Sequence, residues 1–403
     1  MLSLMLHDPA RHEPLCNLRW DEDRARASIR HIVADTEARF SPDTYWPIHP
    51  RDADGGDVPP VTPLYHGAGG VIWALRYLAA VGASEPGRDY RPHLPALRTR
   101  NAQWLASLRE APASYLMGDA GLSLLAYALT PSDDTANRLA SLIETNQANP
   151  ARELMWGAPG TMLAALFMYE NTGDERWAGL FRASAATLAS QLEWSVERQC
   201  RLWSQDLYGE RSTYVGAVHG FAATASPLIR GRRLFTDAQW RDWGQTIATT
   251  IRRTAIEEPA GANWPVVADA SARTPRLMQF CHGAPGVVIC LAQFPGDALD
   301  DMLISAGDAI WAAGPLRKGS NLCHGTAGNG YAFLKLYART GDPRWLARAR
   351  AFAMHAIEQT AKDERHVGHL RYTLWTGDPG VAIYLWDCIH AGARFPTLDV
   401  FFA

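Results

Sequence analysis

The sequence lacks several features that mark particular classes of protein. A formal net charge of −3 over 403 residues is far from the strongly basic balance of nucleic-acid binders and of proteins held on anionic lipid. No segment reaches the roughly 18 uninterrupted apolar residues that a membrane-spanning helix needs. The opening "MLSLMLHDPARHE" has neither the leading basic residues nor the apolar run of a secretory signal. We therefore expect neither a nucleic-acid partner nor a membrane partner.

Cysteine and lysine are also scarce. The six cysteines show no spacing typical of secreted disulfide-bonded modules, so we expect a reducing, cytoplasmic location. Lysine occurs at only three positions, Lys318, Lys335 and Lys362. Packing accounts for four of the cysteines, because free cysteine is usually buried; these are Cys16, Cys200, Cys290 and Cys388.

Glycine, in contrast, recurs in a pattern. A Gly-x-x-Gly element followed by an apolar run appears six times, as in "HGAGGVIWAL", "MGDAGLSLLAYAL", "WGAPGTMLAALF", "CHGAPGVVICLA", "CHGTAGNGYAFL" and "TGDPGVAIYLW". A seventh copy, "VHGFAATASPL", keeps Gly220 but has Ala223 at the second position. Runs rich in Ala and Leu that are apolar on most sides indicate buried helices. Units that recur at roughly 50 residues indicate a repeat architecture.

Each unit also contains a second helix. In "YENTGDERW" and "YARTGDPRW" the Thr-Gly-Asp segment ends one helix and caps the next. The following "RWLARARAFAMHAI" alternates apolar and basic residues with helical period, which predicts an amphipathic helix. An all-α chain of seven helical hairpins either stacks as an open solenoid or closes into a ring. We expect a single domain over residues 1–403, in which residues 1–60 form an N-terminal extension with a first outer helix.

A closed ring would gather the glycine turns, and the residues beside them, at one end. The candidates are His66, Glu153, His219, Cys281, His282, Cys323 and His324. The Pro- and Gly-rich loops at 41–63 and 258–277 would then cover this end as a roof. We interpret His66, Asp119 and Asp378, which lie in other turns, as helix-capping groups.

Two of the seven turns carry a Cys-His-Gly motif, in "QFCHGAPGVV" and "NLCHGTAGNG". Two thiolates and an imidazole suit zinc, and three protein ligands leave a fourth position open, as in catalytic sites. Packing of small residues beside a helix start is the alternative, and the spacing leaves both interpretations open. A zinc-held thiol would be a thiolate at neutral pH, and its addition to an electrophilic carbon would need a nearby proton donor. His219 and Glu153 are placed for such a role, although each also fits an ordinary hydrogen-bonded side chain.

The paired "CHGAPGV" and "CHGTAGNGYAFL" motifs, the glycine turns and the "TGDxRW" hairpins resemble the lanthionine synthetase C-like family, from about residue 60 to the end. The resemblance implies an α/α toroid of seven inner and seven outer helices. It also implies one Zn²⁺ bound by Cys281, Cys323 and His324. Members of this family add a thiol to dehydroalanine or dehydrobutyrine. Bacterial cyclases use a cysteine of the same peptide, whereas LanC-like members use glutathione.

The resemblance also assigns further residues. His219 of "VHG" matches the proton donor, and Glu153 matches an acidic position where cyclases have aspartate. Cyclases commonly have Trp-Cys-Tyr-Gly where this chain has Phe-Cys-His-Gly, so the chain is closer to the LanC-like branch. There, Arg317 and Lys318 match basic residues that meet the carboxylates of glutathione. His282 is either an acid–base group or a residue that orients a ligand.

The predicted function is therefore zinc-dependent Michael addition of glutathione to dehydroamino acids in a peptide or protein. A lanthionine-forming peptide cyclase and a zinc-containing receptor or scaffold without catalysis are the alternatives. A glycan hydrolase, another enzyme class built on α/α toroids, would rely on paired carboxylates and would need no cysteine.

Overall fold

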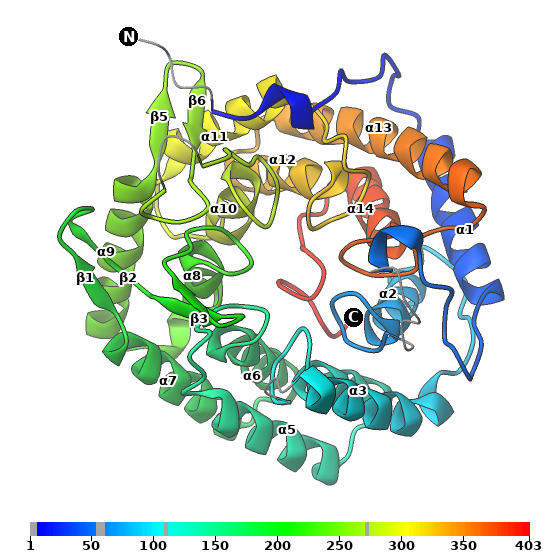
Figure 1. Ribbon diagram of the computed structural model, residues 1–403, viewed down its shortest axis with the longest axis horizontal. Helices are drawn as coiled ribbons and strands as arrows, with labels where there is room; N and C mark the ends of the chain where they lie inside the picture. The colour runs from blue at the N-terminus through cyan, green and yellow to red at the C-terminus, as the bar shows by residue number, and fades with distance from the viewer. Residues whose placement is uncertain (1–5, 54–60, 109–111, 271–273) are drawn as a thin grey trace.

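The computed structural model describes residues 6–53, 61–108, 112–270 and 274–403, and its helices form two concentric rings (Figure 1). The inner helices are α2 (Ala68–Ala80), α4 (Asp119–Leu129), α6 (Ala158–Thr172), α8 (Phe221–Arg230), α10 (Ala284–Leu291), α12 (Thr326–Thr340) and α14 (Asp378–His390). The outer helices are α1 (Glu22–Ala38), α3 (Leu94–Leu108), α5 (Asp133–Asn146), α7 (Glu175–Ser190), α9 (Asp237–Thr254), α11 (Asp300–Ala313) and α13 (Pro343–Val367). The ring closes where α14 packs on α1 and α2. The α/α toroid of seven inner and seven outer helices is confirmed, and the open solenoid is excluded.

The described residues also contain short 3₁₀ helices and short strands. The 3₁₀ helices are η1 (Pro9–Arg11), η2 (Pro50–Asp52), η3 (Arg91–His93) and η4 (Arg232–Leu234). Six strands pair as three antiparallel hairpins: β1 (Glu193–Ser195) with β2 (Cys200–Leu202), β3 (Gln205–Leu207) with β4 (Glu210–Ser212), and β5 (Ile256–Glu258) with β6 (Gly261–Asn263). Within the described residues, no helix is long and apolar enough to cross a membrane.

The glycine turns begin all seven inner helices. The first glycine of each turn is the N-cap residue, and the chain enters the helix from extended backbone in most copies. At the second glycine of the six complete copies, an added Cβ would lie 1.9–2.2 Å from the carbonyl oxygen six residues earlier. Only glycine allows the turn to fold this tightly against its own helix.

The Thr-Gly-Asp segments act as the sequence predicted. Gly173 ends α6 with a φ of 68°, and the side chain of Asp174 accepts a hydrogen bond from the backbone N–H of Arg176 at the start of α7. Gly341 and Asp342 do the same between α12 and α13. A left-handed backbone favours glycine, and the aspartate accepts a hydrogen bond from a free amide of the next helix. One helix therefore ends and the next one begins sharply at each segment.

Backbone hydrogen bonds join the glycine turns around the ring. In each turn the bonded residue lies two positions before the first glycine. Cys281 N–H donates to Cys323 O (3.1 Å), Cys323 N–H donates to Trp375 O (2.9 Å), and Trp375 N–H donates to Tyr65 O (3.1 Å). Tyr65 N–H then donates to Leu116 O at 2.9 Å. The residues at this position and the next one therefore converge at one end of the toroid, as the repeat predicted.

The C-terminal segment runs into the middle of the ring (Figure 1). Its carbonyl groups accept hydrogen bonds from inner-helix and turn side chains, from Tyr115 Oη to Thr397 O (2.8 Å) and from Trp73 Nε1 to Phe401 O (3.0 Å). Phe395 stacks on Phe280, with ring centroids 4.8 Å apart. The segment thus fills the space under the turn that carries Cys281.

Two loops were predicted to form a roof. Residues 54–60 of the first and 271–273 of the second lie outside the described residues. In the second, the predicted loop begins inside the β5–β6 hairpin, so its first part is strand. In the first, η2 is tied by ion pairs to the α13–α14 region, as detailed below.

Candidate functional site

The two Cys-His-Gly turns bring their sulfur atoms together. Cys281 and Cys323 are both buried, and the two thiols are close enough to shift each other's pKa. The neighbouring Cys323 thiol lowers the pKa of Cys281, while the Cys281 thiol and burial raise the pKa of Cys323. The pair therefore favours one thiolate and one thiol, which is the start of a sulfur-rich metal site.

His324 is half-buried beside this pair, and its backbone N–H donates to Asn321 Oδ1 at 3.0 Å. Burial, and after it the positive charge of Lys318, lowers the pKa of His324 to about 3, which keeps the imidazole neutral as a metal ligand must be. Among the described residues, however, no three His, Cys, Asp or Glu side chains are grouped closely enough to hold a metal ion. Two thiols and a neutral imidazole fit zinc in their chemistry, but the three predicted ligands are not grouped as a complete site in the described residues.

His219 and Glu153 form a second pair at the same end of the ring. His219 Nδ1 lies 2.9 Å from Glu153 Oε2, and the fully buried carboxylate also accepts backbone N–H groups of Met155 (2.8 Å) and Trp156 (2.5 Å). Burial acts to lower the pKa of His219, but the hydrogen bond and charge of Glu153 outweigh it and raise that pKa. A protonated imidazole held by a buried carboxylate is suited to donate a proton.

His282 connects the two pairs in space. Its ring centroid is 6.3 Å from that of His219, and the ring of Tyr214 lies 5.9 Å from His219 and 6.1 Å from His282. Burial lowers the pKa of His282 to about 4, so its imidazole is neutral at physiological pH. Its Nδ1 has no hydrogen-bond partner among the described residues. A neutral ring in this place is not an acid at neutral pH, but it remains available as an acceptor or as a positioning group.

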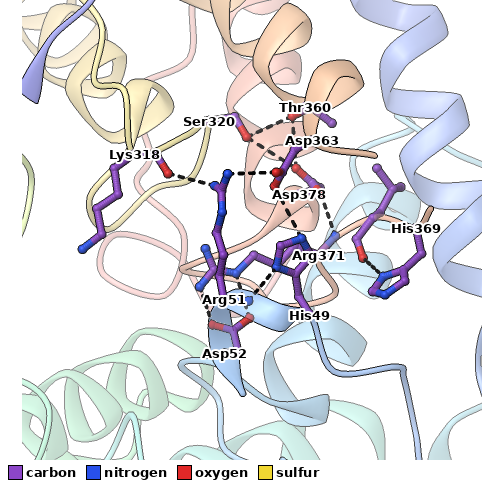
Figure 2. A network of polar contacts seen from close by, with 11 residues as sticks. His49, Arg51, Asp52, Lys318, Ser320, Thr360, Asp363, His369, Arg371 and Asp378 are labelled. Carbon is purple, nitrogen blue, oxygen red and sulfur yellow. Dashed lines mark hydrogen bonds and ion pairs between the residues drawn. The ribbon is translucent and has the colours of Figure 1, made fainter. Parts of the chain in front are cut away.

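Arg317 and Lys318 lie on the turn before Cys323. Arg317 Nε donates to His12 O at 2.6 Å, and the side chain lines a cavity of about 280 Å³ together with Arg51, Lys362 and Arg371. The exposed side chain of Lys318 points away from the polar network around this cavity (Figure 2). The two predicted basic residues thus face different spaces.

The polar network in Figure 2 joins η2, in the first predicted roof loop, to the Cys323 turn, to α13 and to the segment before α14. Arg51 donates to Lys318 O (3.0 Å) and to Asp363 Oδ1 (2.9 Å). Arg371 makes a two-pronged ion pair with Asp52, with Nε 2.7 Å from Oδ2. Because both members of the Arg371–Asp52 pair are largely buried, this contact is screened little by solvent. It fixes η2 beside the segment that precedes α14, while the bond from Arg51 to Lys318 O holds η2 beside the Cys323 turn.

The capping role predicted for three turn residues is wrong. The N-cap residues are the glycines, and Asp378 instead accepts the backbone N–H of Arg371 (2.8 Å) and the hydroxyl of Thr360 (3.0 Å). Asp119 is buried between Arg98 (3.0 Å) and Arg138 (2.6 Å). His66 packs by its ring against Trp104, with centroids 5.9 Å apart. A glycine at the N-cap leaves the next side chain free to bind a neighbouring turn or helix.

The sequence prediction missed two residues that touch the sulfur atoms. Tyr65 Oη donates to Cys323 Sγ at 2.9 Å, and Gln279 Nε2 donates to Cys281 Sγ at 2.8 Å. Tyr65 occupies the repeat position equivalent to the two cysteines, and Gln279 lies two residues before Cys281. An alignment of the repeats places Tyr65 at the position of the two cysteines, so the sequence could have indicated that Tyr65 lies near them.

A family model described as lanthionine synthetase C-like protein matches residues 61–400. Glutathione S-transferase LANCL1 of Danio rerio is 30% identical over 315 residues, covering 73% of this chain and 76% of that protein. LanC-like protein GCL1 of Arabidopsis thaliana is 29% identical over 263 residues, which cover 62% of this chain and 58% of that protein. Among solved structures, nisin cyclase shares the fold, with a TM-score of 0.63 at 16% identity over 93% of this chain and 97% of that one. The chain therefore belongs to the lanthionine synthetase C-like family.

Proposed function

We propose that this protein adds the thiol of glutathione to dehydroalanine or dehydrobutyrine residues of a peptide or protein, with Zn²⁺ held by Cys281, Cys323 and His324. The observation that carries the proposal is that two buried thiols, which shift each other's pKa, lie at the same end of the ring as the His219–Glu153 pair. The relative named glutathione S-transferase supports glutathione as the thiol. A reducing, cytoplasmic location is part of the proposal, because all six cysteines are free.

The ligands are assigned by donor chemistry. Two sulfur atoms and a neutral imidazole are typical of zinc. His324 directly follows Cys323, so a different rotamer of its side chain would change the distance between its imidazole and the two sulfur atoms. Zinc held by these residues would lower the pKa of a bound thiol and so supply a thiolate at neutral pH.

The chain's own residues complete the reaction. The thiolate sulfur forms a bond to the β-carbon of the dehydroamino acid as the carbon–carbon double bond breaks, and negative charge develops toward the α-carbon. Protonated His219 gives its proton to that α-carbon, and Glu153 stabilises the imidazolium and fixes which nitrogen faces the substrate. The proton released by the glutathione thiol balances the proton that His219 gives.

Glutathione carries two carboxylates and one ammonium group. The cavity of about 280 Å³ offers groups of both signs, with Arg317 and Lys362 beside Glu13 and Asp363. We assign one carboxylate of glutathione to Arg317 in this cavity. Lys318 faces another space, and we assign it to the second carboxylate, since its charge acts on the two thiols. His282, neutral and near His219, is assigned to positioning of the substrate.

The test is an adduct assay by mass spectrometry. A peptide that contains one dehydrobutyrine and one cysteine is incubated with the protein, with and without glutathione. A mass increase equal to one glutathione supports the proposal. A thioether ring formed at unchanged mass, whether or not glutathione is present, would instead identify a peptide cyclase, and no product in either arm would favour a receptor or scaffold.

Two variants separate metal binding from proton transfer. We expect His219→Ala to retain one zinc per chain and to lose adduct formation, while Cys323→Ala loses both. The matched controls are His390→Ala, an exposed histidine at the end of α14, and Cys290→Ala, a buried cysteine of α10. Equal activity of His219→Ala and the unchanged protein would exclude the proton-donor role.

A further inference from the structure

Each candidate sulfur ligand accepts a hydrogen bond from an uncharged side chain that the proposed reaction does not use. The donors are Tyr65 Oη, 2.9 Å from Cys323 Sγ, and Gln279 Nε2, 2.8 Å from Cys281 Sγ. They come from different turns, since Tyr65 belongs to the first glycine turn and Gln279 to the fifth, which also carries Cys281. One donor therefore serves each sulfur atom.

Both donors are held by the fold. The backbone of Tyr65 donates to Leu116 O and accepts from Trp375 N–H, and its ring lies 5.6 Å from the ring of Trp375. Gln279 is buried, and its backbone exchanges two hydrogen bonds with His282, at 3.1 and 3.2 Å. Side chains fixed in this way donate at little further cost in conformational entropy.

A hydrogen bond to a thiolate withdraws negative charge from sulfur and fixes the direction of its lone pairs. We propose that Tyr65 and Gln279 are positioning residues that orient Cys323 and Cys281 and limit the charge that the two sulfur atoms give to a bound metal ion. Less donation from sulfur leaves the metal better able to acidify an incoming thiol. This inference rests on the proposed zinc site.

Cobalt substitution tests the inference without relying on turnover. Co²⁺ bound to thiolates gives a sulfur-to-metal charge-transfer absorption whose energy reports the donor strength of sulfur. We expect Tyr65→Phe and Gln279→Leu each to shift this band to longer wavelength, because a thiolate without its hydrogen bond donates more strongly. We also expect each to lower adduct formation about tenfold, because a metal ion that receives more charge from sulfur acidifies the incoming thiol less.

The matched control is Tyr115→Phe. Tyr115 is a buried tyrosine next to the second glycine turn, and its hydroxyl donates to Thr397 O instead of to sulfur. The charge-transfer spectrum of cobalt-substituted Tyr115→Phe should coincide with that of the unchanged protein. Thermal unfolding of all variants shows whether each one folds, and Gln279→Leu remains informative if Tyr65→Phe does not.

The outcomes are distinct. If the charge-transfer bands of both folded variants coincide with the band of the unchanged protein, the inference is wrong, and the proposed zinc site is unaffected. A shift in Tyr115→Phe as large as in Tyr65→Phe also overturns it, because the effect would then be general. If the unchanged protein shows no sulfur-to-cobalt band at all, the proposed metal site itself is wrong, and the inference falls with it.

Discussion

We expect the carboxylate of Glu153 to set the pH range in which His219 acts as the proposed proton donor. An acid must be protonated, so activity that depends on His219 is present below its raised pKa and is lost as pH rises through that value. In Glu153→Gln the burial remains but the charge is gone, so the pKa falls. We expect the descending limb of kcat/KM against pH to move to lower pH.

The control for this profile is Glu170→Gln, which removes an exposed carboxylate of α6 that pairs with Arg230 of α8. Its descending limb should match that of the unchanged protein. Coincident limbs for Glu153→Gln and the unchanged protein would show that Glu153 does not tune His219.

Asp378 should make stability depend on pH in the direction opposite to most carboxylates. Burial raises its pKa from 3.8 to about 6, so between these values the folded protein holds a proton that the unfolded chain releases. Stability from this group is therefore present at low pH and falls as pH rises, by at most about 3 kcal/mol. We expect Asp378→Asn to remove this component, measured by urea unfolding at several pH values.

Asp301→Asn, at the exposed start of α11, serves as the comparison for Asp378→Asn. The informative quantity is the difference in unfolding free energy between variant and unchanged protein, plotted against pH. A difference for Asp378→Asn that is flat across pH 4–6 would mean that this carboxyl is not protonated in the folded state.

At the scale of the helix, the second glycine of each turn carries a steric requirement. A Cβ at Gly160 would lie 2.2 Å from Leu154 O and 2.9 Å from Tyr115 Cβ. We expect Gly160→Ala to lower the unfolding free energy by about 1–3 kcal/mol, because the turn and α6 must move apart. Denaturant unfolding measures the change.

Gly179, inside the outer helix α7, is the matched position, since a Cβ there meets nothing within 4 Å. Gly179→Ala should raise stability by about 0.5–1 kcal/mol, as alanine loses less backbone entropy in a helix. Destabilisation of equal size at both positions would contradict the steric explanation.

The helices were predictable because their signals are local. Glycine turns, Thr-Gly-Asp breaks and helical periodicity each span a few residues, and the structure follows them. The hairpins at 193–212 and 256–263 were missed because strands of three residues are too short to show alternation. The turn aspartates were misassigned because the capping rule favours aspartate, whereas the tight turn here requires glycine at that position.

At the scale of the whole molecule, the site depends on contacts between distant parts of the chain. Cys281, Cys323, His219 and Glu153 could be found from the repeat and the family motifs. The contact of Tyr65 with Cys323 spans 258 positions, and that of Asp52 with Arg371 spans 319. Such pairs depend on how the ring closes, which no local pattern specifies.

Metal binding should stabilise the entire toroid, because the proposed ligands come from two neighbouring turns. A ligand present at 100 times its Kd adds about 2.7 kcal/mol to the folded state. We expect a chelator to lower the Tm of the unchanged protein and of Cys290→Ala. Cys323→Ala should start lower and respond to no chelator. An unchanged Tm after complete removal of zinc would show that the metal does not link these turns.

The burial of the C-terminal segment in the centre of the ring has a consequence for synthesis. Phe395, Leu398 and Phe401 leave the ribosome after every helix that surrounds them, and α14 must still reach back to α1 and α2. Until these residues reach the centre of the ring, the apolar side chains that they cover in the folded protein remain exposed to water. Chaperones that shield apolar surface therefore have the greatest opportunity to bind this chain before Phe395, Leu398 and Phe401 reach the centre of the ring.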